Sequence, residues 1–144
     1  MNSQVPPSRQ DDRSPDARTL LCAIAEQLSE LIYATDLEGQ LTYVSPASVR
    51  MTGWTPEEVL GRHFSTWLGA GSIQPAIAMF RDTVGSGRPA EAMRLTLRRK
   101  DGTMFVGELN ATRLTDGTRT LGTTGVIRDI TRYVAAETAL RESE

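Results

Sequence analysis

Apolar and polar residues alternate along several short stretches of the chain, and this period of two is typical of β-strands. Residues 31–36 and 40–45 are rich in β-branched and aromatic side chains, and Leu-Glu-Gly separates them, so they predict a hairpin. Three longer stretches follow at 90–100, 103–114 and 118–130, joined by Asp-Gly pairs that favour tight turns. The pattern therefore predicts two strands early in the chain and three late in it.

The region between these two groups of strands has the signals of helices. Residues 45–53 begin with Ser-Pro, an N-cap followed by a proline in the first helical position. Residues 55–58 read Thr-Pro-Glu-Glu, which is a capping box. A longer helix is expected over 72–87, where two glycines end it.

The N-terminal part of the chain changes character twice. Residues 1–16 are rich in Pro, Ser, Gln and Asp, and they predict a disordered lead-in. Residues 17–30 predict an amphipathic helix, which either packs on its own domain or pairs with a second copy, because its spacing also fits a coiled coil. The residues expected at such a dimer contact are Leu21, Ile24 and Leu28.

Residues 132–144 return to a helical pattern. They run charged to the last residue without a Gly or Pro stop, so we expect the truncated start of a longer signalling helix or linker. The order of two strands, helices, three strands and a final helix predicts an α+β fold with an antiparallel sheet.

Composition narrows the class of protein. The chain has 144 residues, 39% of them hydrophobic and 24% charged, which fits one globular domain with tails. Its net charge of −2 gives no electrostatic case for binding nucleic acid or an anionic membrane. No apolar run approaches the roughly 20 residues that span a bilayer, and the N-terminus lacks a signal-peptide pattern. We therefore expect a cytoplasmic domain without membrane contact.

Three segments resemble the PAS family of sensor domains. They are YVSPASVRMTGWTPEEVLGR at 43–62, RRKDGT at 98–103 and GVIRDIT at 125–131, and the resemblance covers about residues 31–131. It implies a five-stranded antiparallel sheet with helices on one face, where family members hold cofactors or small ligands. Helices at either end of the chain would flank this PAS domain.

The stretch GRHFSTWL at 61–68 is similar to the flavin-binding light-oxygen-voltage (LOV) branch of the family. Phe64 stands where that branch has its reactive cysteine. Its flavin-contacting glutamine, two strand asparagines and signalling glutamine fall on Leu68, Leu97, Gly107 and Ile127. Burying the polar edge of a flavin without partners costs about 1–3 kcal/mol for each group. We therefore expect no flavin.

Haem and metal ions are not expected either. Haem-binding relatives mostly use a histidine on the long helix, which here has none over about 72–85. His63 lies two short helices earlier, and we interpret it as a structural residue. His63 and the distant Cys22 cannot supply the three or four ligands of a zinc site.

Matching Gly107 to a ligand-facing position of the family places one face of its strand inside. The expected pocket-lining residues are Phe64, Leu68, Leu95, Leu97, Phe105, Gly107, Leu109 and Ile127. This interior is aliphatic and aromatic. It fits a packed core without a ligand, or an unknown small apolar ligand in a dry cavity, and in either case no cofactor.

The sequence offers no catalytic machinery that we can identify. The single histidine has no nucleophile motif beside it, and no phosphate-binding loop is present. Glu108 could be the buried acid of a small isomerase, but it falls on the outward face of its strand. We therefore expect that this chain is not itself an enzyme.

The end of the last strand predicts the output. Asp129 and Thr131 are expected to bond each other and the first amides of the final helix, which would couple sheet and helix. We expect a homodimeric sensory or dimerisation module of a larger bacterial-type signal transduction protein, with a histidine kinase or cyclic-dinucleotide enzyme as its downstream effector. The alternatives are a small apolar ligand sensor, a flavin or haem sensor, and a small enzyme.

Overall fold

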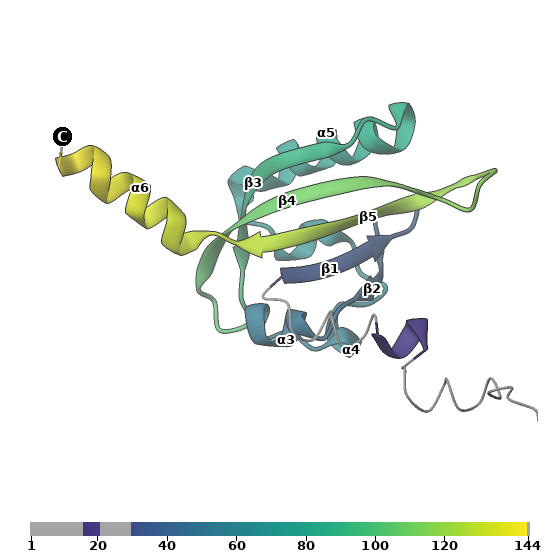
Figure 1. Cartoon of the computed structure of the whole chain (residues 1–144), viewed down its shortest axis with the longest axis horizontal. Helices are drawn as coiled ribbons and strands as arrows, with labels where there is room; N and C mark the ends of the chain where they lie inside the picture. The colour runs from purple at the N-terminus through teal and green to yellow at the C-terminus, as the bar shows by residue number, and fades with distance from the viewer. Residues whose placement is uncertain (1–15, 21–29, 144) are drawn as a thin grey trace, which may run out of the picture.

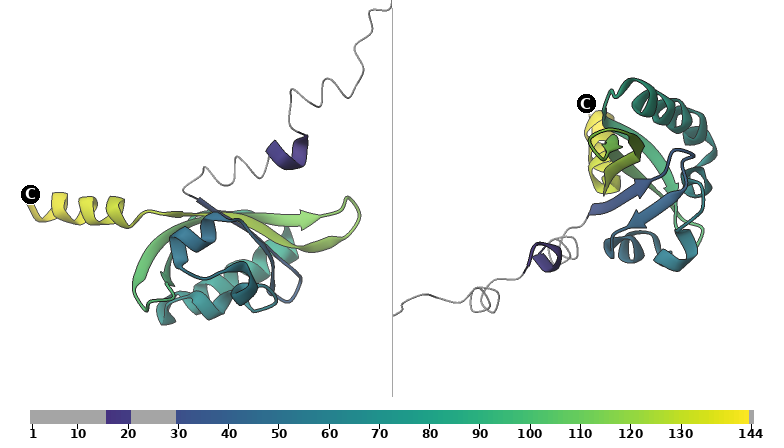
Figure 2. Two further views of the ribbon diagram at one scale, coloured as in Figure 1. Left: turned by 90° about the horizontal axis from the view of Figure 1, so that it is seen from below. Right: turned by 90° about the vertical axis from the view of Figure 1, so that its right-hand side faces the viewer.

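A computed structural model describes residues 16–20 and 30–143 of the chain. It has a five-stranded antiparallel sheet with helices packed on one face (Figures 1 and 2), which confirms the predicted α+β fold. Residues 17–20 are helical. Residues 1–15 of the predicted lead-in and 21–29 of the predicted helix, with the dimer residues Leu21, Ile24 and Leu28, lie outside the described residues. Glu30, which the helix was predicted to include, is instead the first residue of a strand, because it pairs with Arg128.

The strands follow the predicted alternation. In chain order they are β1 (Glu30–Thr35), β2 (Leu41–Val44), β3 (Ala90–Arg98), β4 (Met104–Thr115) and β5 (Thr120–Asp129). Across the sheet the order is β2-β1-β5-β4-β3, and every neighbouring pair is antiparallel. The last strand along the chain, β5, is therefore the central strand of the sheet, paired with β1 on one side and with β4 on the other.

Both hairpins of the last three strands turn at the predicted Asp-Gly pairs. The Asp101 carboxylate accepts the Thr103 N–H at 2.9 Å and its hydroxyl at 2.7 Å. The Asp116 carboxylate accepts the N–H groups of Arg119 and Thr118 at 2.8 and 3.0 Å. These bonds hold the pKa of both carboxyls below the ordinary value, so the turns are fixed by ionised side chains.

Besides residues 17–20, the helices lie between β2 and β3 in sequence, except for the last. They are α3 (Ala47–Thr52), α4 (Pro56–Val59), the 3₁₀ helix η1 (Phe64–Trp67), α5 (Ala70–Ser86) and α6 (Thr131–Ser143). The first four cover one face of the sheet (Figure 2), whereas α6 leaves the end of β5 and projects away from it (Figure 1). Among the residues described, no helix is long and apolar enough to cross a membrane.

The start of α3 differs from the prediction by one residue. Pro46 occupies the cap position and the helix begins at Ala47, because the Ser45 hydroxyl is used elsewhere: it accepts the Ile32 N–H of β1 at 2.9 Å. The capping box of α4 is present as predicted, with the Thr55 N–H bonded to Glu58 Oε1 at 2.9 Å.

Candidate functional site

A cavity of about 90 Å³ lies between the sheet and the helices. On one side its wall comes from β1 to β5, and on the other from α3, α4, η1 and α5. Most of the lining is aliphatic or aromatic, and none of it is charged. An internal space of this kind is the natural candidate for a binding site.

Most of the predicted lining residues surround this cavity. Those in its wall are Phe64, Leu68, Leu95, Leu97, Leu109 and Ile127. Phe105 and Gly107 are also buried, but the structure does not bring them to the cavity.

The positions of Phe105 and Gly107 have a packing reason. The ring of Phe105 lies under the guanidinium of Arg99, 4.5 Å from its centroid. A Cβ at Gly107 would lie 2.7 Å from Leu97 Cδ1 and 2.8 Å from Ile127 Cγ2, so these two side chains close over the glycine. The missing side chain of Gly107 thus leaves the room that Leu97 and Ile127 need to form the cavity wall.

Hydroxyl groups also line the cavity, and the sequence analysis missed them. They belong to Tyr33, Thr35, Ser48, Thr52 and Thr123. The hydroxyls of Thr35 and Thr123 lie 2.8 Å apart, and the Thr123 N–H donates to Thr35 Oγ1 at 3.1 Å. Burial raises the pKa of the Tyr33 phenol far above its ordinary value, against a smaller effect of its hydrogen bond with Thr123, so Tyr33 stays protonated.

The hydroxyls of α3 differ in how they are bonded. Thr52 Oγ1 donates to the Ser48 carbonyl at 2.6 Å and accepts the Trp54 N–H at 3.1 Å. Ser48 is 3% exposed and its Oγ has no hydrogen-bond partner among the described residues. The wall is therefore polar at one point where the protein itself provides no partner.

The cavity wall does not fit a flavin, the cofactor raised by the LOV resemblance. Phe64 lines the cavity at the position of the reactive cysteine, with its ring 5.2 Å from that of Phe80. Leu97 and Ile127 line it where polar partners of a flavin edge would be needed. The cavity is also far smaller than the roughly 300–1,000 Å³ of typical cofactor pockets.

His63 lies at the start of η1, where its contacts are those of a structural residue. It caps the N-terminus of η1, where its Nδ1 accepts the Ser65 N–H at 3.2 Å and lies 2.8 Å from Ser65 Oγ. Its ring stacks on Phe64 with the centroids 4.3 Å apart. These contacts position the Phe64 wall residue.

No cluster of three or more histidine, cysteine, aspartate or glutamate side chains that could hold a metal ion is found within 16–20 and 30–143. Glu108 does not line the cavity. Its carboxylate accepts a hydrogen bond from Arg128 at 2.9 Å, which places it in an ion pair between β4 and β5.

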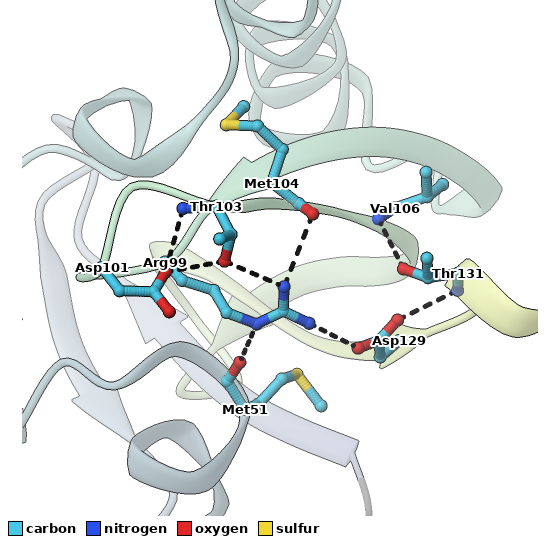
Figure 3. A network of polar contacts seen from close by, with 8 residues as sticks. All are labelled: Met51, Arg99, Asp101, Thr103, Met104, Val106, Asp129 and Thr131. Carbon is cyan, nitrogen blue, oxygen red and sulfur yellow. Dashed lines mark hydrogen bonds and ion pairs between the residues drawn. The ribbon is translucent and has the colours of Figure 1, made fainter.

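The junction between β5 and α6 is a second candidate site. Asp129 Oδ1 accepts the Thr131 N–H at 3.0 Å, and Thr131 Oγ1 accepts the Val106 N–H of β4 at 3.0 Å (Figure 3). The two side chains do not bond each other directly. Together they tie the first residue of α6 to the end of β5 and to β4.

Arg99 connects this junction to α3 (Figure 3), one of the helices that line the cavity. Its Nη2 lies 3.2 Å from Asp129 Oδ2, and its Nε donates to the carbonyl of Met51 in α3 at 3.1 Å. Its Nη1 donates to the Thr103 hydroxyl and the Met104 carbonyl at 3.3 and 3.4 Å. One guanidinium therefore joins the helix that carries Ser48 and Thr52 to the carboxylate at the start of α6.

Further along α6, a second contact reaches the sheet. Arg94 of β3 pairs with Glu137 at 3.2 Å, and its guanidinium lies 5.7 Å from the centre of the Tyr133 ring. The hydrogen bond from Arg94 holds the pKa of Glu137 below its ordinary value. No residue of α6 is buried, and Tyr133 and Leu140 are 59% and 65% exposed.

Sequence reasoning missed Arg99 and Ser48. Arg99 lies within the RRKDGT segment that carried the family resemblance, but its partners come from three other parts of the chain. Nothing in the sequence distinguishes Ser48 from other polar residues of short helices, because its burial and its missing partner depend on how α3 packs.

The described residues thus form an antiparallel sheet closed on one face by helices around a cavity, with α6 leaving the central strand β5. The chain belongs to the PAS family: the family model described as "PAS fold" matches residues 25–135. No curated protein has a sequence similar enough to count as a match.

Solved structures share this fold. An RNA-binding light-oxygen-voltage receptor has a TM-score of 0.73 and 21% identity, over 99% of this chain and 39% of the receptor. The PAS domain of a Colwellia psychrerythraea protein has a TM-score of 0.68 and 19% identity, over 81% of this chain and 99% of the domain. The blue-light-activated histidine kinase EL346 of Erythrobacter litoralis has a TM-score of 0.64 and 21% identity, over 76% of this chain and 36% of the kinase. The chain thus spans about two fifths of the receptor and just over a third of the kinase.

Proposed function

We propose that this chain is the sensory module of a larger signal transduction protein, and that it relays changes at its cavity to an effector through α6. The observation that carries this proposal is the bridging position of Arg99, between the Met51 carbonyl of α3, a helix whose Ser48 and Thr52 line the cavity, and Asp129 at the start of α6. A shift of α3 would move the guanidinium, and with it the carboxylate that bonds the first amide of α6.

The chain has no catalytic role in this proposal, and it works without a flavin, haem or metal cofactor. The similarity to part of a blue-light-activated histidine kinase supports a histidine kinase as the effector. A cyclic-dinucleotide enzyme is the alternative effector in this proposal. We place the domain in the cytoplasm as part of the same proposal, because the proposed effectors act there.

A homodimer is part of the same proposal. A helix of 13 residues without buried side chains is marginal in water when it is alone. Tyr133, Ala136 and Leu140 recur at helical spacing and are exposed, so pairing of α6 with that of a second copy would cover them. Leu21, Ile24 and Leu28 of the N-terminal segment are the proposed second contact.

The relay can be tested without knowledge of the effector. Ala76 is 1% exposed and lines the cavity, so Ala76→Leu fills it, whereas Ala78 is exposed on the same helix and Ala78→Leu is the matched control. We expect Ala76→Leu to change hydrogen exchange of the first α6 amides several-fold, and Ala78→Leu to leave it unaltered.

The role of Arg99 is tested in the same measurement. In an Arg99→Gln background, the cavity-filling substitution is expected to have no effect on α6 exchange. The relay is wrong if α6 does not respond to Ala76→Leu, or if it responds equally with and without the guanidinium.

A further inference from the structure

One polar atom of the cavity wall is left without a partner by the fold. Ser48 lines the cavity, and its Oγ is the single buried side-chain nitrogen or oxygen without a hydrogen bond in the described part of the chain. Ser45, three residues earlier and also buried, uses its hydroxyl to bond the Ile32 N–H. The unpaired state is therefore specific to Ser48.

Folding alone favours alanine at this position. Alanine has the higher helix propensity, and it would remove a buried hydroxyl whose missing hydrogen bond opposes folding. The neighbouring Ala47 is 2% exposed, so α3 accepts a buried alanine without difficulty. A residue that costs stability and gains nothing from the fold is typical of a functional site.

The size and charge of the cavity limit what could bind to Ser48. Its volume of about 90 Å³ is smaller than the roughly 150 Å³ of an engineered cavity that binds benzene. Met79 forms part of the wall and is only partly buried, and a methionine can change rotamer to admit one ring. The lining contains no charged residue, so an ionised ligand would find no counter-charge.

We propose that the cavity binds a neutral molecule no larger than a single ring or a short chain, with one hydroxyl or carbonyl group that hydrogen-bonds to Ser48 Oγ. A serine hydroxyl both donates and accepts, so either group can pair with it. The inference deepens the proposed function by naming its ligand class. It also gives the relay a starting point, because Ser48 lies in the same short helix as Met51, whose carbonyl holds Arg99.

Phenol and benzene are the probes that test this proposal, because they share a ring and differ by one hydroxyl. Their dissociation constants are measured by calorimetry and NMR titration for the wild type and for Ser48→Ala. Ser86→Ala, an exposed serine of α5 outside the cavity, is the control. We expect the preference for phenol over benzene to fall about three- to tenfold in Ser48→Ala and to stay unchanged in Ser86→Ala.

Each other outcome contradicts the proposal. An unchanged phenol preference in Ser48→Ala would show that the hydroxyl is not what the ligand bonds. Absence of binding of both probes at millimolar concentration would show that the cavity does not admit a single ring, against the proposed ligand class. Binding that survives Ala76→Leu would place the probes outside the cavity.

Two features keep the test decisive. If Ser48→Ala fails to fold, the wild-type titration decides, because phenol must then shift the amide signals of α3 more than benzene does. The relay test uses no ligand, so the two proposals can fail separately. The probes can fail to bind while Ala76→Leu still changes exchange in α6, and the probes can bind while exchange in α6 stays unchanged.

Discussion

Arg99 and Asp129 lie 30 residues apart in sequence, and their side chains meet at 3.2 Å where the sheet passes into α6. Asp129 uses its other carboxylate oxygen to accept the Thr131 N–H. We predict that Asp129→Ala, which removes both contacts, lowers the free energy of unfolding by about 1–2 kcal/mol. Asp129→Asn keeps an oxygen for the Thr131 amide and loses only the ion pair, so about half of that loss is expected.

Urea unfolding gives these free energies, and hydrogen exchange at Thr131 distinguishes the two variants. Exchange is expected to accelerate in Asp129→Ala and to change little in Asp129→Asn. Equal acceleration in both would mean that the charge, rather than the acceptor oxygen, holds the start of α6.

Ser45 and Ser48 provide an internal comparison of bonded and unbonded hydroxyls. Ser45→Ala leaves the Ile32 N–H without its acceptor and is expected to cost about 1–2 kcal/mol. Ser48→Ala removes an unpaired atom and is expected to leave the free energy of unfolding unchanged or raise it by up to about 1 kcal/mol. Urea denaturation midpoints of the two variants check this, and a loss at Ser48 equal to that at Ser45 would contradict it.

Gly107 tests how tightly the cavity wall is supported. Its missing Cβ would lie within 3 Å of side-chain atoms of Leu97 and Ile127, so Gly107→Ala forces both to move. We predict a loss of about 1–3 kcal/mol in the free energy of unfolding. Gly85→Ala, in α5 with no atom near the added carbon, is the control and is expected to stabilise the fold by about 0.5–1 kcal/mol.

Glu58 predicts a specific dependence on pH. Its hydrogen bond with the Lys100 ammonium, at 2.6 Å, and that with the Thr55 backbone lower its pKa from 4.5 to about 2. A carboxyl whose pKa is lowered in the folded state stabilises that state above pH 4.5, and it loses this effect as the pH falls towards 2. Glu58→Gln should therefore be less stable than the wild type at pH 7, and the difference should vanish near pH 2.

Urea unfolding at several pH values measures the effect. Glu57→Gln is the control, because Glu57 is exposed in the same helix. A Glu58→Gln difference that is equally large at pH 7 and pH 2 would show that it does not come from the ionised carboxylate.

The exposed face of α6 predicts the oligomeric state. Leu140→Glu places a charge in the proposed seam, and it is expected to convert a dimer to a monomer in analytical ultracentrifugation. Thr138→Glu lies on a different face of α6 and is the control. A wild-type monomer over the accessible concentration range, or a dimer that tolerates Leu140→Glu, would exclude pairing through α6.

Much of the fold was predictable because the sequence expresses it locally. The alternation along β4 and the Asp-Gly turns depend only on near neighbours in the chain, so they can be recognised without coordinates. The start of α3 was placed one residue early, because Ser45 bonds a strand amide that lies 13 residues away.

The candidate site was only partly predictable. Periodicity grouped residues on the two faces of each strand, and the family resemblance at Gly107 implied that Leu95, Leu97 and Leu109 lie inside. Neither gave a reason to expect the hydroxyls of Thr35 and Thr123, which meet between the paired strands β1 and β5. Threonine is common in strands whether or not its hydroxyl is used. Contacts such as these depend on strand pairing and helix packing, which a single sequence does not specify.

The link from Arg99 to α3 ends on the backbone oxygen of Met51. A main-chain oxygen is present whatever side chain the position bears, so in the proposed relay substitutions along α3 change the cavity lining while the hydrogen bond from Arg99 persists. Under this proposal, single substitutions in α3 change the ligand specificity of the domain during evolution, and the connection to α6 does not have to change with it.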